Sequence, residues 1–127
     1  PFLAAYTGTL RSTVALTHFT DARQFLLDHA LDQRDRVTPF LQRPIGTAGL
    51  RFILPQTPEN RGHFHITIES FRFSQREVFV ELKGVFTDQR VQAGDAGEVA
   101  GMLQDLRDYT CDNIYPFLEQ YDTPPED

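Results

Sequence analysis

The sequence predicts an α+β fold, with an antiparallel sheet of three to four strands and a long C-terminal helix packed on one face, in two layers. Two observations predict this fold. Several segments alternate apolar and polar side chains with a period of two, which is typical of strands that bury one face. The end of the chain instead places apolar residues at helical spacing. The resulting order, β-α-β-β-β-α, is typical of a two-layer α+β domain.

The first part of the chain is predicted to hold one strand and one helix. Residues 6–17 alternate, with Tyr6, Leu10, Val14 and Leu16 on one face together with Gly8 and Ser12, and with threonines and Arg11 on the other, which predicts a strand. Thr20 and Asp21 can each cap a helix, and apolar residues at helical spacing follow, so we expect a helix at about 20–33. Proline and glycine interrupt residues 34–47, which predicts a loop.

Three further strands are predicted, at residues 50–54, 63–73 and 77–86. The first is a short apolar run that Pro55 closes. The second changes the phase of its apolar residues near Ser70, which predicts a bulge there. Turn-forming residues separate the three segments, and we expect the last two to pair as an antiparallel hairpin.

The last element is a long amphipathic helix. Residues 88–94 are predicted as a loop, and Asp95 begins a sequence that is close to a capping box. Pro116 is expected to kink or end the helix, because its ring removes one backbone hydrogen bond. Residues 1–122 are then expected to form a single domain, with 123–127 as a frayed tail.

Composition excludes several classes of function. The 127 residues carry 12 basic and 18 acidic side chains, and the net charge of −6 disfavours binding to the phosphates of nucleic acid. No apolar run is long enough to span a bilayer, so we expect no membrane partner. The single cysteine cannot form an internal disulfide, which favours a cytoplasmic location.

One candidate metal site lies in the third predicted strand. Alternation places His63, His65 and Glu69 on one face, and two imidazoles with a carboxylate can ligate a divalent metal. The pattern H-x-H-x-x-x-E resembles part of the first cupin motif, a resemblance that implies a metal site. The glycines that flank the cupin motif are absent. A solvent-facing polar stripe on an antiparallel sheet gives the same pattern.

A second candidate site lies in the fourth predicted strand. Glu81 and Lys83 form the pattern E-x-K at the end of an apolar run, which resembles the PD-(D/E)xK nucleases. The resemblance implies that Glu81 and an upstream acid hold a divalent metal while Lys83 stabilises the attacking water or the transition state. Glu69 is the upstream acid that the neighbouring strand offers. The alternative is a charge pair on the sheet surface.

A third candidate is the first residue. Pro1 is followed by an apolar stretch, and this start resembles the tautomerases that use an N-terminal proline amine as a general base. The second β-α-β unit of that fold is not visible in the sequence.

Since none of these candidates is complete, the sequence favours a non-enzymatic protein-binding or regulatory module. The chain has 11 Phe and 4 Tyr, and exposed aromatic area is typical of a partner surface. Candidate residues lie on the second face of the sheet and at the end of the last helix: Phe71, Phe73, Phe79, Tyr109 and Tyr121. The expected partner is another protein or a second copy of the chain, with no cofactor. The alternatives are a metal-dependent enzyme that uses a divalent metal, and the tautomerase.

Overall fold

The computed structural model describes the chain except for residues 1, 31–40, 44, 71–75, 93–95 and 125–127. Its strands are β1 (Phe2–Ala15), β2 (Gly49–Leu54), β3 (His63–Ser70) and β4 (Glu77–Gln92). Between β1 and β2 the chain forms α1 (Ala22–Gln24) and the π-helical turn η1 (Phe25–Ala30). The C-terminal helix consists of α3 (Ala96–Tyr109), the π-helical turn η2 (Thr110–Ile114) and α4 (Tyr115–Tyr121).

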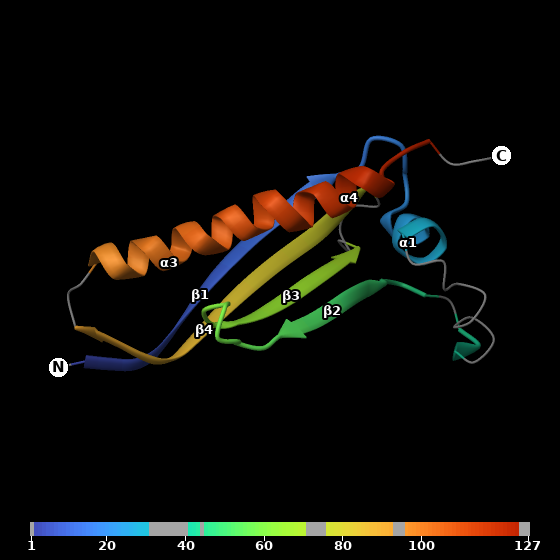
Figure 1. The fold of residues 1–127 in the computed structure, drawn as a ribbon. Coiled ribbons are helices and arrows are strands. Elements are labelled where there is room, and N and C mark those ends of the chain that lie inside the picture. The colour runs from blue at the N-terminus through green and yellow to red at the C-terminus, as the bar shows by residue number, and fades with distance from the viewer. Residues whose placement is uncertain (1, 31–40, 44, 71–75, 93–95, 125–127) are drawn as a thin grey trace.

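The four strands form one antiparallel sheet in the order β1-β4-β3-β2. Ile66 of β3 pairs with Leu82 of β4 on one side and with Phe52 of β2 on the other. The C-terminal helix lies across one face of this sheet, mainly over β1 and β4 (Figure 1). The predicted antiparallel sheet with a long C-terminal helix on one face is therefore confirmed, and β1 and β2 form its two edges.

The hydrophobic core lies between the helix and the sheet. Alternate residues of β3 and β4 point toward the helix and are buried, and Met102, Leu106, Ile114 and Leu118 meet them from the helix. The segment from Leu16 to Leu27 supplies further buried apolar residues at the end of the sheet, where α1 contacts β3. The opposite face of the sheet carries mostly polar residues at the alternate positions, with Ile53, Phe79 and Val85 as apolar exceptions.

Two paired glycines let the helix approach the sheet closely. Gly8 of β1 lies opposite Gly84 of β4, and both face the helix. A Cβ atom at Gly84 would lie 2.8 Å from Cδ2 of Leu106, and one at Gly8 would lie 3.1 Å from Cδ1 of the same residue. Leu106 is fully buried and fills the hollow that the missing side chains leave. This contact fixes the helix above β1 and β4 rather than above β2.

The end of β4 differs from the sequence-based expectation. The predicted loop at 88–94 is wrong over 88–92, because β4 continues to Gln92 and pairs there with Phe2 of β1. The polar residues in that stretch suggested a loop, but the partner strand supplies the backbone hydrogen bonds that keep it extended. Ser70 still pairs with Val78, and the phase change expected just beyond it falls on residues 71–75, outside the described chain.

The two helical segments also differ in detail from the prediction. Asp21 caps α1 as expected, accepting a hydrogen bond from the backbone N–H of Arg23 at 2.9 Å, but the helix continues in the π form to Ala30. At the other end, the helix passes through Pro116 to Tyr121. The N–H of Tyr115 bonds to the carbonyl of Thr110, five residues back, so Pro116 falls in the first turn of α4, where its missing N–H costs little.

Candidate functional site

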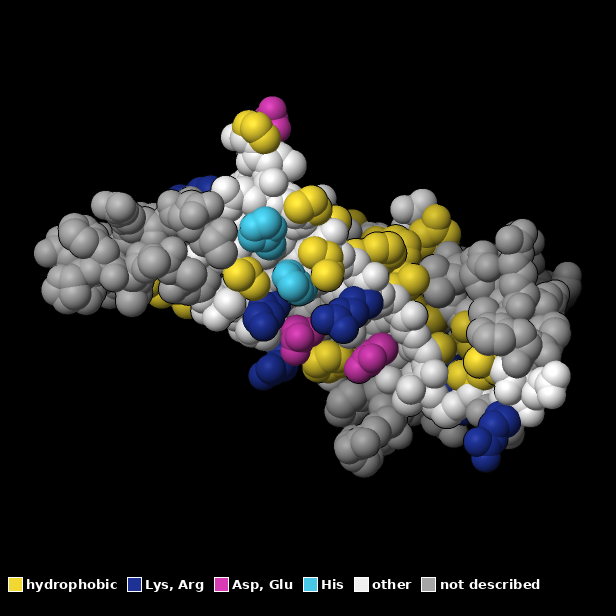
Figure 2. Space-filling model, turned by 90° about the horizontal axis from the view of Figure 1, so that it is seen from below, with side chains coloured by type: hydrophobic (Ala, Val, Ile, Leu, Met, Phe, Trp, Pro, Cys, Tyr) yellow, Lys and Arg dark blue, Asp and Glu magenta, His cyan; other side chains and the backbone are white. Residues whose placement is uncertain are grey.

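The polar residues singled out from the sequence lie together on the open face of the sheet. His63, His65 and Glu69 alternate with helix-facing residues of β3, and Glu81 and Lys83 do the same on β4. His65 lies opposite Lys83, whereas Glu81 lies opposite Thr67 rather than Glu69. Figure 2 shows histidine, basic and acidic side chains gathered in one region of this face. The five residues therefore share one face, with Glu69 and Glu81 on neighbouring strands but not directly opposite each other.

The contacts of these residues favour a polar surface over a metal centre. The carboxylate of Glu81 accepts a hydrogen bond from Nε of Arg11 at 2.7 Å, an ion pair with the other neighbouring strand. Nδ1 of His63 accepts a hydrogen bond from the backbone N–H of Gln56 at 3.1 Å. Within the described part of the chain, no three His, Cys, Asp or Glu side chains are grouped to hold a metal ion. Among the described residues, His63, His65 and Glu69 therefore share a face without forming the group of three ligands that the cupin-like pattern implies.

The aromatic candidates are distributed over several places. Phe79 is half-buried on the open face, opposite Glu69. The ring of Tyr121 packs edge-on against Phe117, with centroids 5.3 Å apart, and lies partly buried against the core. Tyr109 lines a groove beside the helix. Phe71, Phe73 and Pro1 lie outside the described residues. Since the tautomerase hypothesis depends on Pro1, it also concerns a residue that the structure does not describe.

An apolar groove lies between the C-terminal helix and β2. Ile66 and Ile68 form its floor, Leu50 and Phe52 of β2 form one wall, and Tyr109, Asn113, Ile114 and Phe117 of the helix form the other. Its volume is about 350 Å³. Phe52 is 49% exposed although it faces the helix side of the sheet, because the helix lies over β1 and β4 instead. The apolar groove thus follows from where the helix packs.

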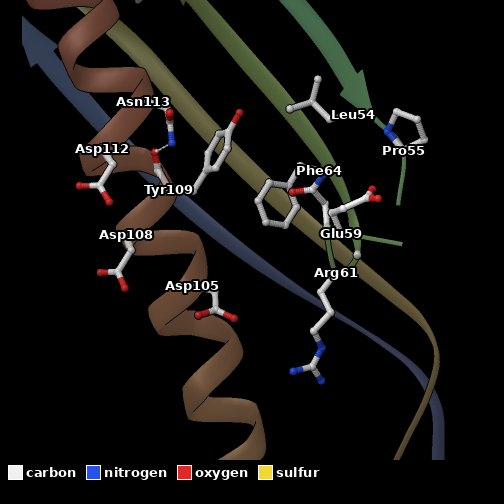
Figure 3. A pocket seen from close by; sticks show the side chains of 12 residues that line it. Leu54, Pro55, Glu59, Arg61, Phe64, Asp105, Asp108, Tyr109, Asp112 and Asn113 are labelled. Atoms are coloured by element: carbon white, nitrogen blue, oxygen red, sulfur yellow. Dashed lines mark hydrogen bonds between the residues drawn. The ribbon is translucent and has the colours of Figure 1, made fainter. Parts of the chain in front are cut away.

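An acidic pocket of about 550 Å³ continues this groove along the helix, and Tyr109 and Asn113 line both. Its walls are the end of β2 at Leu54, the turn between β2 and β3, and the outer side of α3. Figure 3 shows Tyr109 reaching from the helix toward Phe64, with Asp105 projecting to the same side. The rings of Phe64 and Tyr109 meet edge to face, with centroids 5.1 Å apart, and form the floor at the junction of the two cavities.

The turn that walls the acidic pocket is held by its own hydrogen bonds. Besides the bond from Gln56 to His63, the side-chain oxygen of Gln56 accepts from the N–H of Gly62 at 3.1 Å, and Thr57 and Asn60 exchange two backbone bonds. Gly62 has a φ of 77°, and a Cβ there would lie 2.5 Å from the ring of Phe86. Glycine is therefore required at this position for both backbone conformation and space, and the pocket wall is largely preformed.

The acidic pocket carries a negative potential. Its lining residues include four acidic ones, Glu59, Asp105, Asp108 and Asp112, and one basic one, Arg61. Of the three helix acids, Figure 3 shows Asp105 projecting toward the side of Phe64, while Asp108 and Asp112 project to the other side of the helix. Asp108 accepts a hydrogen bond from the side-chain amide of Gln104 at 2.8 Å. Between the described residues, no ion pair involves any of the four carboxylates. The formal charge of −6 on the chain adds to this local field.

Comparison with protein-family models, with curated proteins and with solved structures found no match, so the groove is interpreted from its own geometry. Among its residues, only Tyr109 was a candidate from the sequence. Phe52 and Leu54 were missed, although an apolar run that a proline closes is typical of an edge strand. The acidic residues of α3 were not identified as candidates, because exposed acidic side chains are common on the polar face of an amphipathic helix.

None of the helices in the described residues is long and apolar enough to cross a membrane.

Proposed function

We propose that this chain is a non-enzymatic module that binds an extended segment of another protein along β2. The backbone of that segment would pair with the open edge of β2, and its alternate side chains would enter the apolar groove. Adding a strand to an exposed sheet edge is a common mode of peptide recognition, in which backbone bonds supply affinity and side-chain pockets supply specificity.

The exposure of β2 is the observation that carries this proposal. Phe52, Ile53 and Leu54 are consecutive in the chain and are 49%, 57% and 38% exposed. Three consecutive exposed apolar residues on an edge strand are uncommon, because such an edge invites pairing with another chain. A groove lined by apolar side chains lies directly beside them. β2 therefore presents the backbone groups of an edge strand next to an apolar groove, and a peptide in extended conformation can bind to both.

The proposal is tested by selecting ligands from a displayed library of random peptides and measuring their affinity for three forms of the chain. Phe52→Asp places a charge in the apolar groove and should weaken binding at least about tenfold, since burying a Phe side chain is worth about 1.5–3 kcal/mol. Ile53→Asp is the matched control, because Ile53 pairs with His65 and so lies on the open face of the same strand. It should weaken binding much less.

Thermal melts of the variants provide the control for folding. Since Phe52 is half exposed, Phe52→Asp should keep a cooperative transition close to that of the unmodified chain. A library that yields no ligand, or ligands that bind Phe52→Asp as tightly as the unmodified chain, would contradict the proposal.

A further inference from the structure

We infer that a second copy of this chain pairs with the free edge of β1, so that the four strands of each copy join into one continuous sheet. This surface is separate from β2, and the inference therefore goes beyond the proposed function. It follows from the way the C-terminal helix lies along β1 and from a leucine that the helix leaves exposed there.

β1 is a long strand with an unpaired edge. It spans Phe2–Ala15 and pairs with β4 on one side, and among the described residues no strand pairs with its other side. Proline, charged side chains and short length are the usual features that keep an edge strand from pairing with another chain. β1 contains no proline, and its one charged residue, Arg11, forms an ion pair with Glu81 at 2.7 Å. This edge therefore lacks the usual protection.

The C-terminal helix follows β1 (Figure 1). Leu106 sits above both Gly8 and Gly84, since a Cβ atom at either glycine would lie within 3.1 Å of its side chain. Farther along the helix, the hydroxyl of Tyr115 donates a hydrogen bond to Oγ of Ser12 at 2.7 Å. The helix is therefore held over the edge strand at two points and shields the helix-facing side of β1 along its length.

Leu103 lies on the side of the helix that faces the free edge of β1. A Cβ atom at Gly8 would lie 3.0 Å from its side chain, and yet Leu103 is 48% exposed. Asp105 and Tyr109 are both more than half a turn away around the helix axis, and Figure 3 shows them reaching toward the side of Phe64 on β3. The free edge of β1 and an exposed apolar side chain above it thus form one surface.

A second copy fits this surface with standard dimensions. Because the helix lies above both β1 and β4, an antiparallel pair of β1 strands around a two-fold axis brings the two helices about 10 Å apart, the usual distance between packed helices. An axis beside Gly8 pairs the two strands over nearly their whole length and places Thr7 opposite Thr9 of the partner subunit. Leu103 then covers Leu103 of the partner subunit.

The shape of this surface favours a second copy over a peptide. A single added strand would pair with the backbone of β1 but would leave Leu103 exposed. A partner that carries a helix at the same height above its own edge strand covers both, and this chain has that shape. We expect a dimer that buries roughly 1,000–1,200 Å² in total, at the lower end of specific interfaces, with a Kd of about 10–100 µM.

Sedimentation equilibrium of the full chain over about 5–300 µM tests the inference. Leu103→Glu should weaken the dimer at least about tenfold, because it removes an apolar contact and places two carboxylates across the axis. Gln104→Glu is the matched control. It adds the same charge at the next position, which is also exposed but points about 100° around the helix, and it should change the Kd by less than about threefold. Since both residues are exposed, thermal melts should show that both variants fold.

Oxidative cross-linking tests the position of the axis. In a Cys111→Ser background, which removes the one native thiol, Leu103→Cys should form a disulfide-linked dimer readily. Gln104→Cys in the same background is the control and should cross-link much more slowly.

The outcomes separate this inference from the proposed function. A chain that stays monomeric at about 300 µM, or equal effects of Leu103→Glu and Gln104→Glu, would overturn the inference, while peptide binding at β2 would still be measurable. Equal cross-linking rates of the two cysteine variants would overturn it as well. A dimer that Phe52→Asp abolishes and Leu103→Glu does not would place the second copy on β2 and would contradict both proposals.

Discussion

The two edges of the sheet differ in length, in polarity and in what covers them. β1 spans Phe2–Ala15 and lies beneath the C-terminal helix, to which it is tied by a 2.7 Å hydrogen bond from the hydroxyl of Tyr115 to Oγ of Ser12. The open face of β1 carries threonines and Arg11. β2 spans only Gly49–Leu54 and carries one charged residue, and in the described part of the chain the C-terminal helix lies over β1 and β4 instead.

This difference shows that the position of one helix decides which apolar surface remains available. The hollow at Gly8 and Gly84 holds Leu106 and draws the helix over β1 and β4. The helix-facing side of β2 is built from the same kind of apolar residues as β3 but is less covered by the described residues, since Phe52 is 49% exposed and Leu50 is only partly buried. Charged or short edge strands usually resist pairing with another chain. β2 is short but almost uncharged and borders the apolar groove, which distinguishes it from β1 as a site for an extended segment of another protein.

The contact that holds the helix over β1 should be the most sensitive to mutation. Leu106→Ala should lower the free energy of unfolding by about 2–5 kcal/mol, because Leu106 is fully buried against both glycines. Leu103→Ala on the same helix is the control, since Leu103 is 48% exposed, and it should cost less than about 1 kcal/mol. Urea unfolding measures both values. Equal effects would mean that the helix does not pack as described.

Substitutions of Gly84 and Gly101 test how closely the C-terminal helix approaches the sheet. Gly84→Ala should destabilise by about 1–3 kcal/mol, because its Cβ would lie 2.8 Å from both Leu106 and Phe86, and neither buried side chain has room to move away. Gly101→Ala should instead stabilise by about 0.5–1 kcal/mol, since the position is inside α3 and open to solvent. The two substitutions should shift the midpoint of thermal unfolding in opposite directions. A stabilised Gly84→Ala variant would contradict the account.

The C-terminal end of the helix is fastened to the chain that follows β1. The carboxylate of Asp122 accepts hydrogen bonds from the backbone N–H groups of Thr17 and His18, at 2.7 and 2.9 Å. Asp122→Ala should cost about 1–2 kcal/mol of stability because it leaves both donors without this charged acceptor. Glu119→Ala, at an exposed position of α4, serves as the control and should change stability by no more than about 0.5 kcal/mol. If Asp122→Ala also changed stability by no more than about 0.5 kcal/mol, the hydrogen bonds of Asp122 would not hold the end of the helix in place.

The smallest expected effect concerns the cap of α1. Burial raises the pKa of Asp21, but hydrogen bonds from Arg23, its positive charge and a backbone bond from Gln24 together hold that pKa below the ordinary value of 3.8. A lowered pKa in the folded state stabilises the fold above that ordinary value, and the contribution is lost as the pH falls through the lowered pKa. The stability advantage over Asp21→Asn should therefore be present at neutral pH and shrink below about pH 3.8. An advantage that grows in acid would contradict this assignment.

Most of the fold could be predicted from the sequence. Alternation predicted β3 and much of β1 and β4, and helical spacing predicted the C-terminal helix, because both patterns are local consequences of one buried face. The length of β4 was not predictable in this way. Residues 88–92 are polar except for Val91, and what keeps them extended is pairing with a strand more than 80 residues earlier in the chain.

The candidate site was less accessible from the sequence. The shared face of His63, His65 and Lys83 followed from alternation, but the ion pair of Glu81 with Arg11 required knowledge of the strand order. The groove beside Phe52 depends on the same information, since the strand order and the position of the helix decide which apolar side chains remain exposed. Tyr109 was identified from aromatic content alone, without its partner Phe64.

Hydrogen exchange tests the central claim most directly, because it compares the two edges in one experiment. A saturating amount of a selected peptide should slow exchange of backbone amides in Gly49–Leu54 by at least about tenfold and leave those of residues 7–15 in β1 unchanged. Slowed exchange in β1, or in β3 and β4 without β2, would place the partner elsewhere and contradict the account.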